Sequence, residues 1–246
     1  MSNNESWNTG IPPPIFAKLY CDWNKVKREV KLLDKLFKKY SVENVIEYGC
    51  GIGRHGYLLS KLGYDILLTD IHDWRFGRSR ELKFRVYDVL KDGTIGEFDA
   101  GFAIGLVIIL DKDKIPLVLK NMLSNIKKGG ILVFDYNFTT LNEPPVRTCR
   151  VNGRKYTAIL KYEHSEVING GWRYRYRIEV YDENNNLVGV EDTGYPVLSF
   201  ETFMYLINKN GFKIVDIIKA HWNPERYVYE FNSDNFDSAF IVLENV

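Results

Sequence analysis

The sequence has few residues that could form disulfides or bind metals. It contains three cysteines in 246 residues, an odd number, and they are too scattered to form a Cys-x-x-Cys pair. This usage argues against a disulfide framework and is typical of a reducing compartment, so we expect a cytoplasmic protein. The histidines are equally dispersed, and no metal site is predicted. The residues concerned are Cys21, Cys50, Cys149, His55, His72, His164 and His221.

Long hydrophobic runs and an excess of one charge are also absent. The longest apolar run, residues 102–110, is about half of the roughly 18 residues that a membrane helix needs. The N-terminus is polar and lacks the pattern of a secretion signal. With 33 basic and 32 acidic residues the net charge is only +1, which is low for a protein that binds polyanions. We therefore expect no membrane segment and no nucleic-acid partner.

The chain shows an alternation of short apolar segments and amphipathic ones. Apolar residues recur every three or four positions over residues 22–40, which predicts a helix with a solvated lysine-rich face. The pattern predicts further helices at residues 54–62, 113–126 and 200–210. It predicts strands at residues 44–48, 64–69, 83–87, 98–104, 131–136, 212–219 and 238–243. Such an alternation indicates a parallel sheet with helices on both faces.

Two parts of the chain differ from this pattern. Residues 146–195 are rich in β-formers and turn signals, which predicts three or four antiparallel strands. Residues 12–14 are three prolines, which favour an extended conformation. We therefore divide the chain into a flexible N-terminal segment (1–21), an α/β domain (22–140 and 196–246) and an antiparallel insertion (141–195).

Glycines and acidic residues follow three of the predicted parallel strands. The glycines of residues 49–53 follow the first strand, Asp70 ends the second, and Asp88 follows the third. In open α/β sheets, ligands bind at the carboxyl ends of the strands. These residues are therefore expected to converge on one ligand site.

The glycine-rich segment by itself fits two classes of cofactor. Residues 51–56 match Gly-x-Gly-x-x-Gly, and Asp70 follows at the distance of a ribose-binding acid, as in nicotinamide-dinucleotide proteins. However, Glu47 stands two residues before Gly49. A pyrophosphate gains nothing from that negative charge, whereas a cofactor with an ammonium and a sulfonium group does.

The sequence resembles the class I S-adenosylmethionine-dependent methyltransferases, with matching motifs in order along about 120 residues. The matching segments are Val45-Ile-Glu-Tyr-Gly-Cys-Gly-Ile-Gly-Arg-His55, Leu68-Thr-Asp70, Tyr87-Asp88-Val89, residues 98–105, residues 126–133, Phe200 and residues 206–212. The chain departs from the family pattern in two places. Residues 73–79 form a poor helix, which predicts a short or irregular crossover. Residues 106–110 are unusually apolar.

The resemblance implies a doubly wound, mostly parallel seven-stranded sheet of Rossmann-like type, with the last strand antiparallel and an antiparallel sheet inserted. It implies S-adenosylmethionine as cofactor and S-adenosylhomocysteine as product. Asp70 would bind the ribose hydroxyls, and Asp88 would bind the adenine amino group. Glu47 would support the glycine loop and the cofactor ammonium. Taken in isolation, the two aspartates could instead be turn residues. The expected cofactor-binding residues are Glu47, Gly49, Cys50, Gly51, Gly53, Arg54, His55, Asp70, Ile71, Asp88, Val89, Ile104 and Gly105.

The acceptor is expected to be a small molecule with a nitrogen or oxygen nucleophile. Residues 105–108, after the fourth predicted strand, lack the [Asp/Asn/Ser]-Pro-Pro-aromatic motif of enzymes that methylate exocyclic amines of nucleic acids. In-line methyl transfer needs mainly positioning and desolvation, so the catalytic residue stays unknown. His164 is one candidate base, and a surface histidine is the alternative.

The insertion leaves two interpretations open. Arg173, Arg175 and Arg177 alternate with Tyr174 and Tyr176, so arginines and tyrosines occupy opposite faces. The arginine face is either a solvated surface or an electropositive wall, which would suit an anionic substrate.

An insertion at this place resembles those of methyltransferases that act on amino sugars, glycine and similar small molecules. The resemblance implies that the insertion (141–195) covers the substrate site and that the N-terminal segment (1–21) is a second lid. By that analogy Tyr20, with Phe16 and Trp23, closes over the cofactor; the alternative is that these residues pack the first helix. Together with Arg173 and Arg175, Tyr20 is an expected substrate or lid residue. Three alternative functions are a methyltransferase that docks RNA or protein on the insertion, a non-catalytic S-adenosylmethionine-binding protein, and a dinucleotide oxidoreductase. The sequence also leaves a homodimer open.

Overall fold

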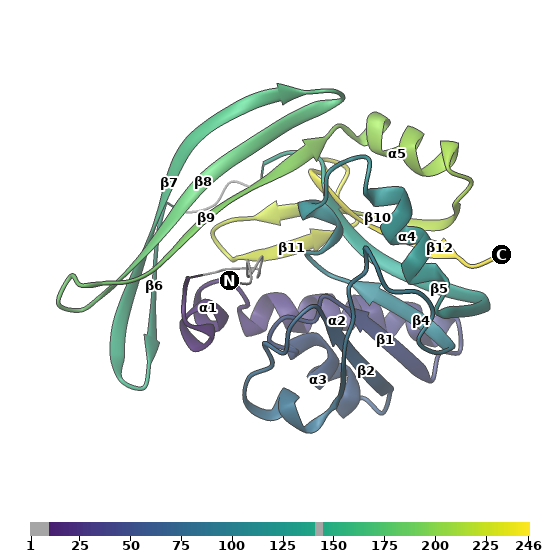
Figure 1. Cartoon of the computed structure of the whole chain (residues 1–246), viewed down its shortest axis with the longest axis horizontal. Helices are drawn as coiled ribbons and strands as arrows, with labels where there is room; N and C mark the ends of the chain where they lie inside the picture. The colour runs from purple at the N-terminus through teal and green to yellow at the C-terminus, as the bar shows by residue number, and fades with distance from the viewer. Residues whose placement is uncertain (1–9, 141–144) are drawn as a thin grey trace.

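The main body of the protein is an eight-stranded sheet. In the computed structural model, which describes residues 10–140 and 145–246, the strand order is β11-β10-β12-β5-β4-β1-β2-β3 (Figure 1). The strands are β1 (Asn44–Tyr48), β2 (Asp65–Asp70), β3 (Lys83–Val86), β4 (Phe98–Ala103), β5 (Ile126–Asn137), β10 (Lys213–Asn223), β11 (Val228–Phe231) and β12 (Ser238–Glu244). Strands β12 and β11 run in the direction opposite to the other six, so the pairs β5–β12, β12–β10 and β10–β11 are antiparallel. The mostly parallel, doubly wound sheet is therefore confirmed, whereas the expected count of seven strands misses the short edge strand β11.

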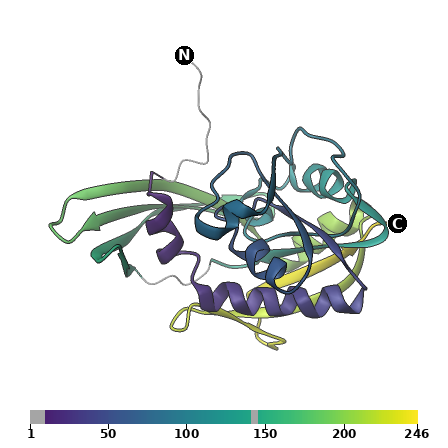
Figure 2. The ribbon, with the colours of Figure 1, turned by 90° about the horizontal axis from the view of Figure 1, so that it is seen from below.

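Helices cover both faces of this sheet. On one face lie α2 (Trp23–Lys39) and α3 (Arg54–Lys61), which bury Val30, Leu33 and Leu59 against β1, β2 and β4. On the other face lie α4 (Ile115–Leu123) and α5 (Phe200–Lys209). Figure 2 shows α2 running along one side of the sheet. The apolar spacing of residues 22–40 thus produces the buried stripe that a helix on a sheet requires.

Two connections differ from regular helices. The crossover after β2 contains only a short 3₁₀ helix, η1 (Gly77–Glu81), as the poor helical pattern of residues 73–79 predicts. The apolar stretch after β4 forms a second 3₁₀ helix, η2 (Val107–Ile109). The predicted helix over 113–126 is too long, because α4 ends at Leu123 and residues 127–130 already belong to β5. Gly129 has a φ of 79°, and its N–H donates to the carbonyl oxygen of Asn245 at 2.7 Å.

A second, four-stranded sheet is formed by the part of the chain that follows β5 and precedes α5. It consists of β6 (Val146–Val151), β7 (Arg154–Ile168), β8 (Gly171–Asp182) and β9 (Leu187–Leu198), all antiparallel in this order. The predicted inserted antiparallel sheet is thus confirmed. In Figure 1 it is the curved green sheet beside the main one. Its predicted start, residue 141, lies outside the described residues.

A short helix precedes α2 and packs on the inserted sheet. Helix α1 (Pro13–Leu19) buries Ile15 and Leu19 against Ile178 and Val180 of β8 (Figure 2). The expectation of an extended segment is wrong for Pro13 and Pro14, which occupy the first turn of α1. A proline there loses no helical hydrogen bond, because the first N–H groups of a helix have no partner. Residues 1–9 of the predicted flexible segment lie outside the described part of the chain.

We call the face of the inserted sheet that carries α1 the inner face. In residues 10–140 and 145–246, no helix is both long and apolar enough to cross a bilayer.

Candidate active site

A cavity of about 350 Å³ opens at the carboxyl ends of β1, β2 and β4. We call it the first cavity. Eleven of the thirteen expected cofactor-binding residues line it: Glu47, Gly49, Cys50, Gly51, Arg54, His55, Asp70, Ile71, Val89, Ile104 and Gly105. The expected convergence of strand ends is therefore present in the structure. Whether these residues bind a cofactor stays a prediction.

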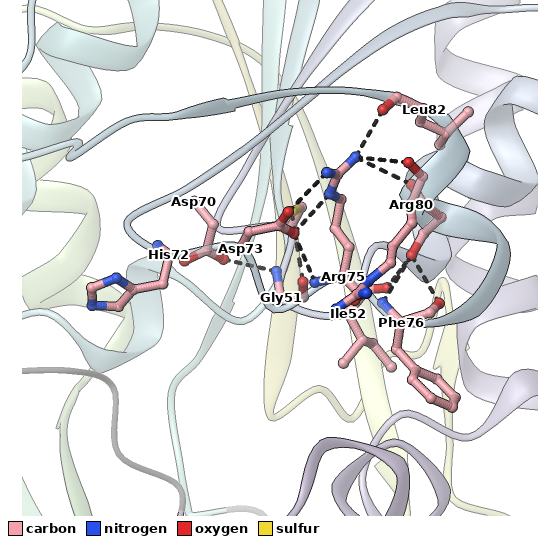
Figure 3. Close-up of polar contacts among 11 residues, drawn as sticks. Gly51, Ile52, Asp70, His72, Asp73, Arg75, Phe76, Arg80 and Leu82 are labelled. Atoms are coloured by element: carbon pink, nitrogen blue, oxygen red, sulfur yellow. Dashed lines mark hydrogen bonds and ion pairs between the residues drawn. The ribbon is translucent and has the colours of Figure 1, made fainter.

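The glycine loop closes one side of this cavity and is tied to the end of β2. Gly49 and Gly51 have φ values of 65° and 51°, in the left-handed region that glycine adopts without strain. The N–H of Gly51 donates to Asp70 Oδ2 at 2.8 Å (Figure 3). Burial raises the pKa of the Asp70 carboxyl, and the backbone N–H groups of Gly51 and His72 oppose that shift. The loop therefore holds one carboxylate oxygen of Asp70 in a fixed place.

The irregular crossover after β2 contacts the glycine loop and stabilises it. Figure 3 shows the Arg75 guanidinium between Asp73, at 2.8 Å, and the carbonyl oxygen of Leu82, also at 2.8 Å. Ser79 Oγ donates to the carbonyl oxygen of Ile52 at 2.7 Å. A Cβ on Gly53 would lie 2.7 Å from Ser79 Cβ, so Gly53 allows this close approach. Gly53 does not line the cavity, and its place is structural.

Glu47 lies at the floor of the first cavity and is almost completely buried. Its Oε2 accepts the Gly56 N–H at 2.9 Å, and its Oε1 lies 3.9 Å from His55 Nδ1. Burial raises the pKa of the Glu47 carboxyl to about 7, against the opposing effects of His55 and the Gly56 N–H. A cationic ligand group beside Glu47 would stabilise its ionised form.

A lysine that the sequence pattern places on a solvated helix face also lines this cavity. Lys25 is partly buried, and its Nζ lies 3.0 Å from Glu29 Oε1. Glu29 Oε2 in turn lies 2.8 Å from His55 Nε2. Burial alone would lower the Lys25 pKa, but the charge of Glu29 reverses the effect and raises it. The sequence held one signal for this contact: Glu29 falls within the apolar spacing of Val26, Val30 and Leu33, on the side of the helix that is buried. A buried carboxylate requires a partner, and Lys25 lies one turn away.

Asp88 does not line the first cavity. Its Oδ1 accepts the N–H of Leu90 at 2.9 Å, and its Oδ2 lies 3.0 Å from Lys91 Nζ. Its neighbours Tyr87 and Val89 line the cavity instead. The structure thus shows Asp88 in a turn beside the cavity, and its contact with the adenine amino group stays a prediction.

A second cavity, of about 740 Å³, adjoins the first on the inner face of the inserted sheet. Tyr20 lies in its wall, and its role as a substrate or lid residue stays a prediction. Arg147 lies over the ring of Tyr20 at 5.1 Å. Further lining residues are Tyr162, Tyr174, Leu160 and Ile178. Five residues line both cavities: Phe16, Ile108, Tyr176, Glu191 and Tyr195. The apolar stretch after β4 therefore serves as part of the shared wall.

The arginines of β8 lie on the outer face of the inserted sheet, and the tyrosines lie on the inner face. Arg173 contacts Asp111 and Glu166, and Arg177 contacts Asp192 at 2.9 Å. Arg173 and Arg175 line a separate depression together with acidic side chains, and neither lines the first or second cavity. The interpretation as an electropositive wall over the site is therefore wrong, because strand alternation turns these side chains away from it.

His164 is exposed and pairs with Arg175 across β7 and β8. It lines neither cavity, so its position does not support a role as base. In the described part of the chain, no group of three or more His, Cys, Asp or Glu side chains could hold a metal ion.

No family model matches the sequence. Over 94 residues the chain is 27% identical to the probable S-adenosyl-L-methionine-dependent methyltransferase TehB of Haemophilus influenzae. The aligned part is 35% of this chain and 33% of TehB, so the chain spans about a third of the length of the curated relatives it matches.

Solved structures match almost the whole chain. An S-adenosylmethionine-dependent methyltransferase from Clostridium acetobutylicum superposes with a TM-score of 0.68 at 13% identity, covering 93% of this chain and 95% of that one. CalS10 from Micromonospora echinaspora, an amino pentose methyltransferase solved with S-adenosylmethionine bound, gives 0.62 at 13% identity, covering 89% and 92%. The chain therefore has the fold of the S-adenosylmethionine-dependent methyltransferases.

Proposed function

We propose that this protein is an S-adenosylmethionine-dependent methyltransferase that acts on a small molecule through a nitrogen or oxygen nucleophile. One observation carries the proposal: Glu47, the glycine loop and Asp70 line one cavity, and this cavity shares five lining residues with a second, tyrosine-lined cavity. A cofactor and an acceptor would meet where the two cavities adjoin. The TehB similarity and the fold support the same activity.

The chemistry of the first cavity suits each part of S-adenosylmethionine. The carboxylate of Asp70 would accept hydrogen bonds from the ribose hydroxyls. Glu47 would stabilise the ammonium, and Lys25 would supply a positive charge for the carboxylate of the methionine part. Tyr87 and Val89 offer apolar surface for the adenine. A pyrophosphate would instead meet the negative charge of Glu47, which argues against a dinucleotide.

The bound cofactor would supply an activated methyl group, and the protein would supply position and a dry environment. Leu106, Ile108 and Ile109 line the first cavity with apolar side chains. Side chains of this kind exclude water and strengthen electrostatic interactions inside the cavity. Holding the nucleophile in line with the methyl group can account for most of the acceleration.

A small acceptor fits the second cavity better than a macromolecule fits the outer face. Arg173 and Arg177 there are paired with acidic side chains, which weakens the case for docking RNA or an acidic protein. CalS10, which has the same fold, acts on an amino pentose. A cytoplasmic location and a homodimer stay predictions from the sequence.

Calorimetry with S-adenosylmethionine, S-adenosylhomocysteine and NAD tests the proposal. We expect micromolar binding of the first two and none of NAD. Asp70→Ala is expected to weaken binding about 100-fold, because it removes charge-assisted hydrogen bonds to the ribose that contribute about 1.5 to 3 kcal/mol each. Asp65→Ala is the matched control, because Asp65 lies at the opposite end of β2 and outside the cavity, and it should change affinity by less than about threefold. Binding of NAD alone would refute the proposal.

A further inference from the structure

Strand alternation places one carboxylate of the inserted sheet inside the site. On β9, Glu191, Thr193 and Tyr195 line the first cavity, whereas Asp192 points to the outer face and pairs with Arg177. Glu191 pairs across the sheet with Ile178, which lines the second cavity. It is the one carboxylate among the described residues that lines both cavities.

Glu191 also differs from the other carboxylates that line these cavities in the described part of the chain, because one of its oxygens is buried without a hydrogen-bond partner. The guanidinium of Arg147, which lines the second cavity, lies over the ring of Tyr227 at 3.4 Å. Glu47 and Asp70 accept backbone N–H groups, Lys25 and His55 contact Glu29, and Arg54 donates to the carbonyl oxygen of Ala17 at 2.8 Å. Glu191 Oε2, in contrast, is buried without a hydrogen-bond partner within the part of the chain that the structure describes. A buried carboxylate oxygen without a partner is costly, and a ligand at the site is one way to satisfy it.

The surroundings of Glu191 favour a proton acceptor that works near neutral pH. Burial raises the pKa of its carboxyl to about 7, and no other group adds to or opposes this shift. A general base is most effective when its pKa lies near the working pH. The other groups around it in the shared wall are Phe16, Ile108, Tyr176 and Tyr195, none of which carries a charge at that pH.

We propose that Glu191 is a catalytic residue that holds the amino group of the acceptor and takes up its proton, so that the acceptor is an amine with an apolar or ring-shaped body. This inference rests on the proposed methyltransferase function and narrows its substrate class. The tyrosines of the second cavity would contact the body of the acceptor, and Glu191 would place its nitrogen at the junction with the first cavity.

The step balances with the groups already named. The acceptor nitrogen forms the new N–C bond with its lone pair, and the C–S bond of the sulfonium breaks with its electron pair left on sulfur. Before this attack the bound ammonium gives one proton to the Glu191 carboxylate, which frees the lone pair. The methylated product keeps the positive charge on nitrogen, and the proton on Glu191 passes to solvent. An alcohol acceptor would gain less from Glu191, because it carries no positive charge to pair with the carboxylate.

Matched probes of equal shape test this assignment without knowledge of the natural acceptor. Cyclohexylamine with cyclohexanol, and benzylamine with benzyl alcohol, are titrated at pH 8 into the protein saturated with S-adenosylhomocysteine. We expect each amine to bind at least about tenfold more tightly than its alcohol, as a charge-assisted hydrogen bond in a buried site would give. Glu191→Gln should abolish this preference and keep the affinity for S-adenosylhomocysteine. Asp192→Asn, which changes the outer face, should keep both the preference for the amine and the affinity for S-adenosylhomocysteine.

The outcomes separate the two proposals. Failure of S-adenosylhomocysteine to bind would refute the methyltransferase function. If S-adenosylhomocysteine binds normally, three results would overturn the role of Glu191. These are equal affinity for amine and alcohol, no binding of any amine, and a preference for the amine that survives in Glu191→Gln. Any amine that is methylated adds a second readout: Glu191→Gln should lower kcat and remove the pH dependence near 7 from the rate.

Discussion

Replacement of Gly56 by alanine is expected to lower the free energy of unfolding by about 2 to 3 kcal/mol and to prevent cofactor binding. Gly56 lies in α3, where a Cβ would come within 2.3 Å of Leu68 Cδ2 and 2.7 Å of Glu47 Oε2. Both side chains are buried and cannot move aside without disturbing the floor of the first cavity. The better helix propensity of alanine, about 1 kcal/mol, offsets only part of this overpacking.

Gly93→Ala is the matched control, because a Cβ at Gly93 meets no atom within 4 Å and its φ is not in the left-handed region. Thermal and denaturant unfolding of the two variants would be compared with titration of S-adenosylhomocysteine. A Gly56→Ala protein as stable as Gly93→Ala, with unchanged affinity, would contradict the close packing of α3 on β2 and Glu47.

Glu47→Gln is expected to make the protein more stable at pH 8 and to weaken cofactor binding. Burial raises the pKa of the Glu47 carboxyl from 4.5 to about 7. The folded state therefore keeps a proton between these values that the unfolded state has lost, and the contribution of Glu47 to stability falls as pH rises through this window. A shift of this size corresponds to about 3 kcal/mol.

The glutamine amide can still accept the Gly56 N–H but has no charge to lose. The stability of the variant relative to the natural protein should thus rise by about 3 kcal/mol between pH 4.5 and 8, because the other titrating carboxyls are common to both. Denaturant unfolding across this pH range gives the difference directly. A difference independent of pH would mean that the Glu47 carboxyl is not raised in pKa. Unchanged affinity for S-adenosylmethionine would mean that Glu47 does not stabilise the ammonium group of the cofactor.

The strands and their ends could be predicted because local patterns determine them. The apolar residues 44–48 followed by glycines, and residues 64–69 followed by Asp70, combine a buried strand with a turn that only certain residues adopt. Strand β11 was missed because Val228–Phe231 is only four residues long and is specified by pairing with β10. Helix α1 was missed because prolines in its first turn resemble an extended segment.

The site residues that were missed depend on contacts between distant parts of the chain. The alternation of residues 173–177 correctly separates arginines from tyrosines, but nothing local says which face meets the site. Glu191 and Lys25 look like ordinary surface charges in the sequence. Glu191 reaches the cavities because β9 lies against η2 with the Glu191 face turned inward, and Lys25 reaches the first cavity because α2 packs beside the glycine loop.

The two cavities are built largely from separate parts of the chain. The glycine loop and Asp70 belong to the main sheet, whereas Tyr162 and Tyr174 belong to the inserted sheet and line only the second cavity. Changes at such positions can therefore alter which acceptor is taken without a cost in cofactor affinity. Under the proposed function, selection for a new acceptor can proceed one side chain at a time through active intermediates. The inserted sheet can also be exchanged by design while the main sheet and its glycine loop stay intact.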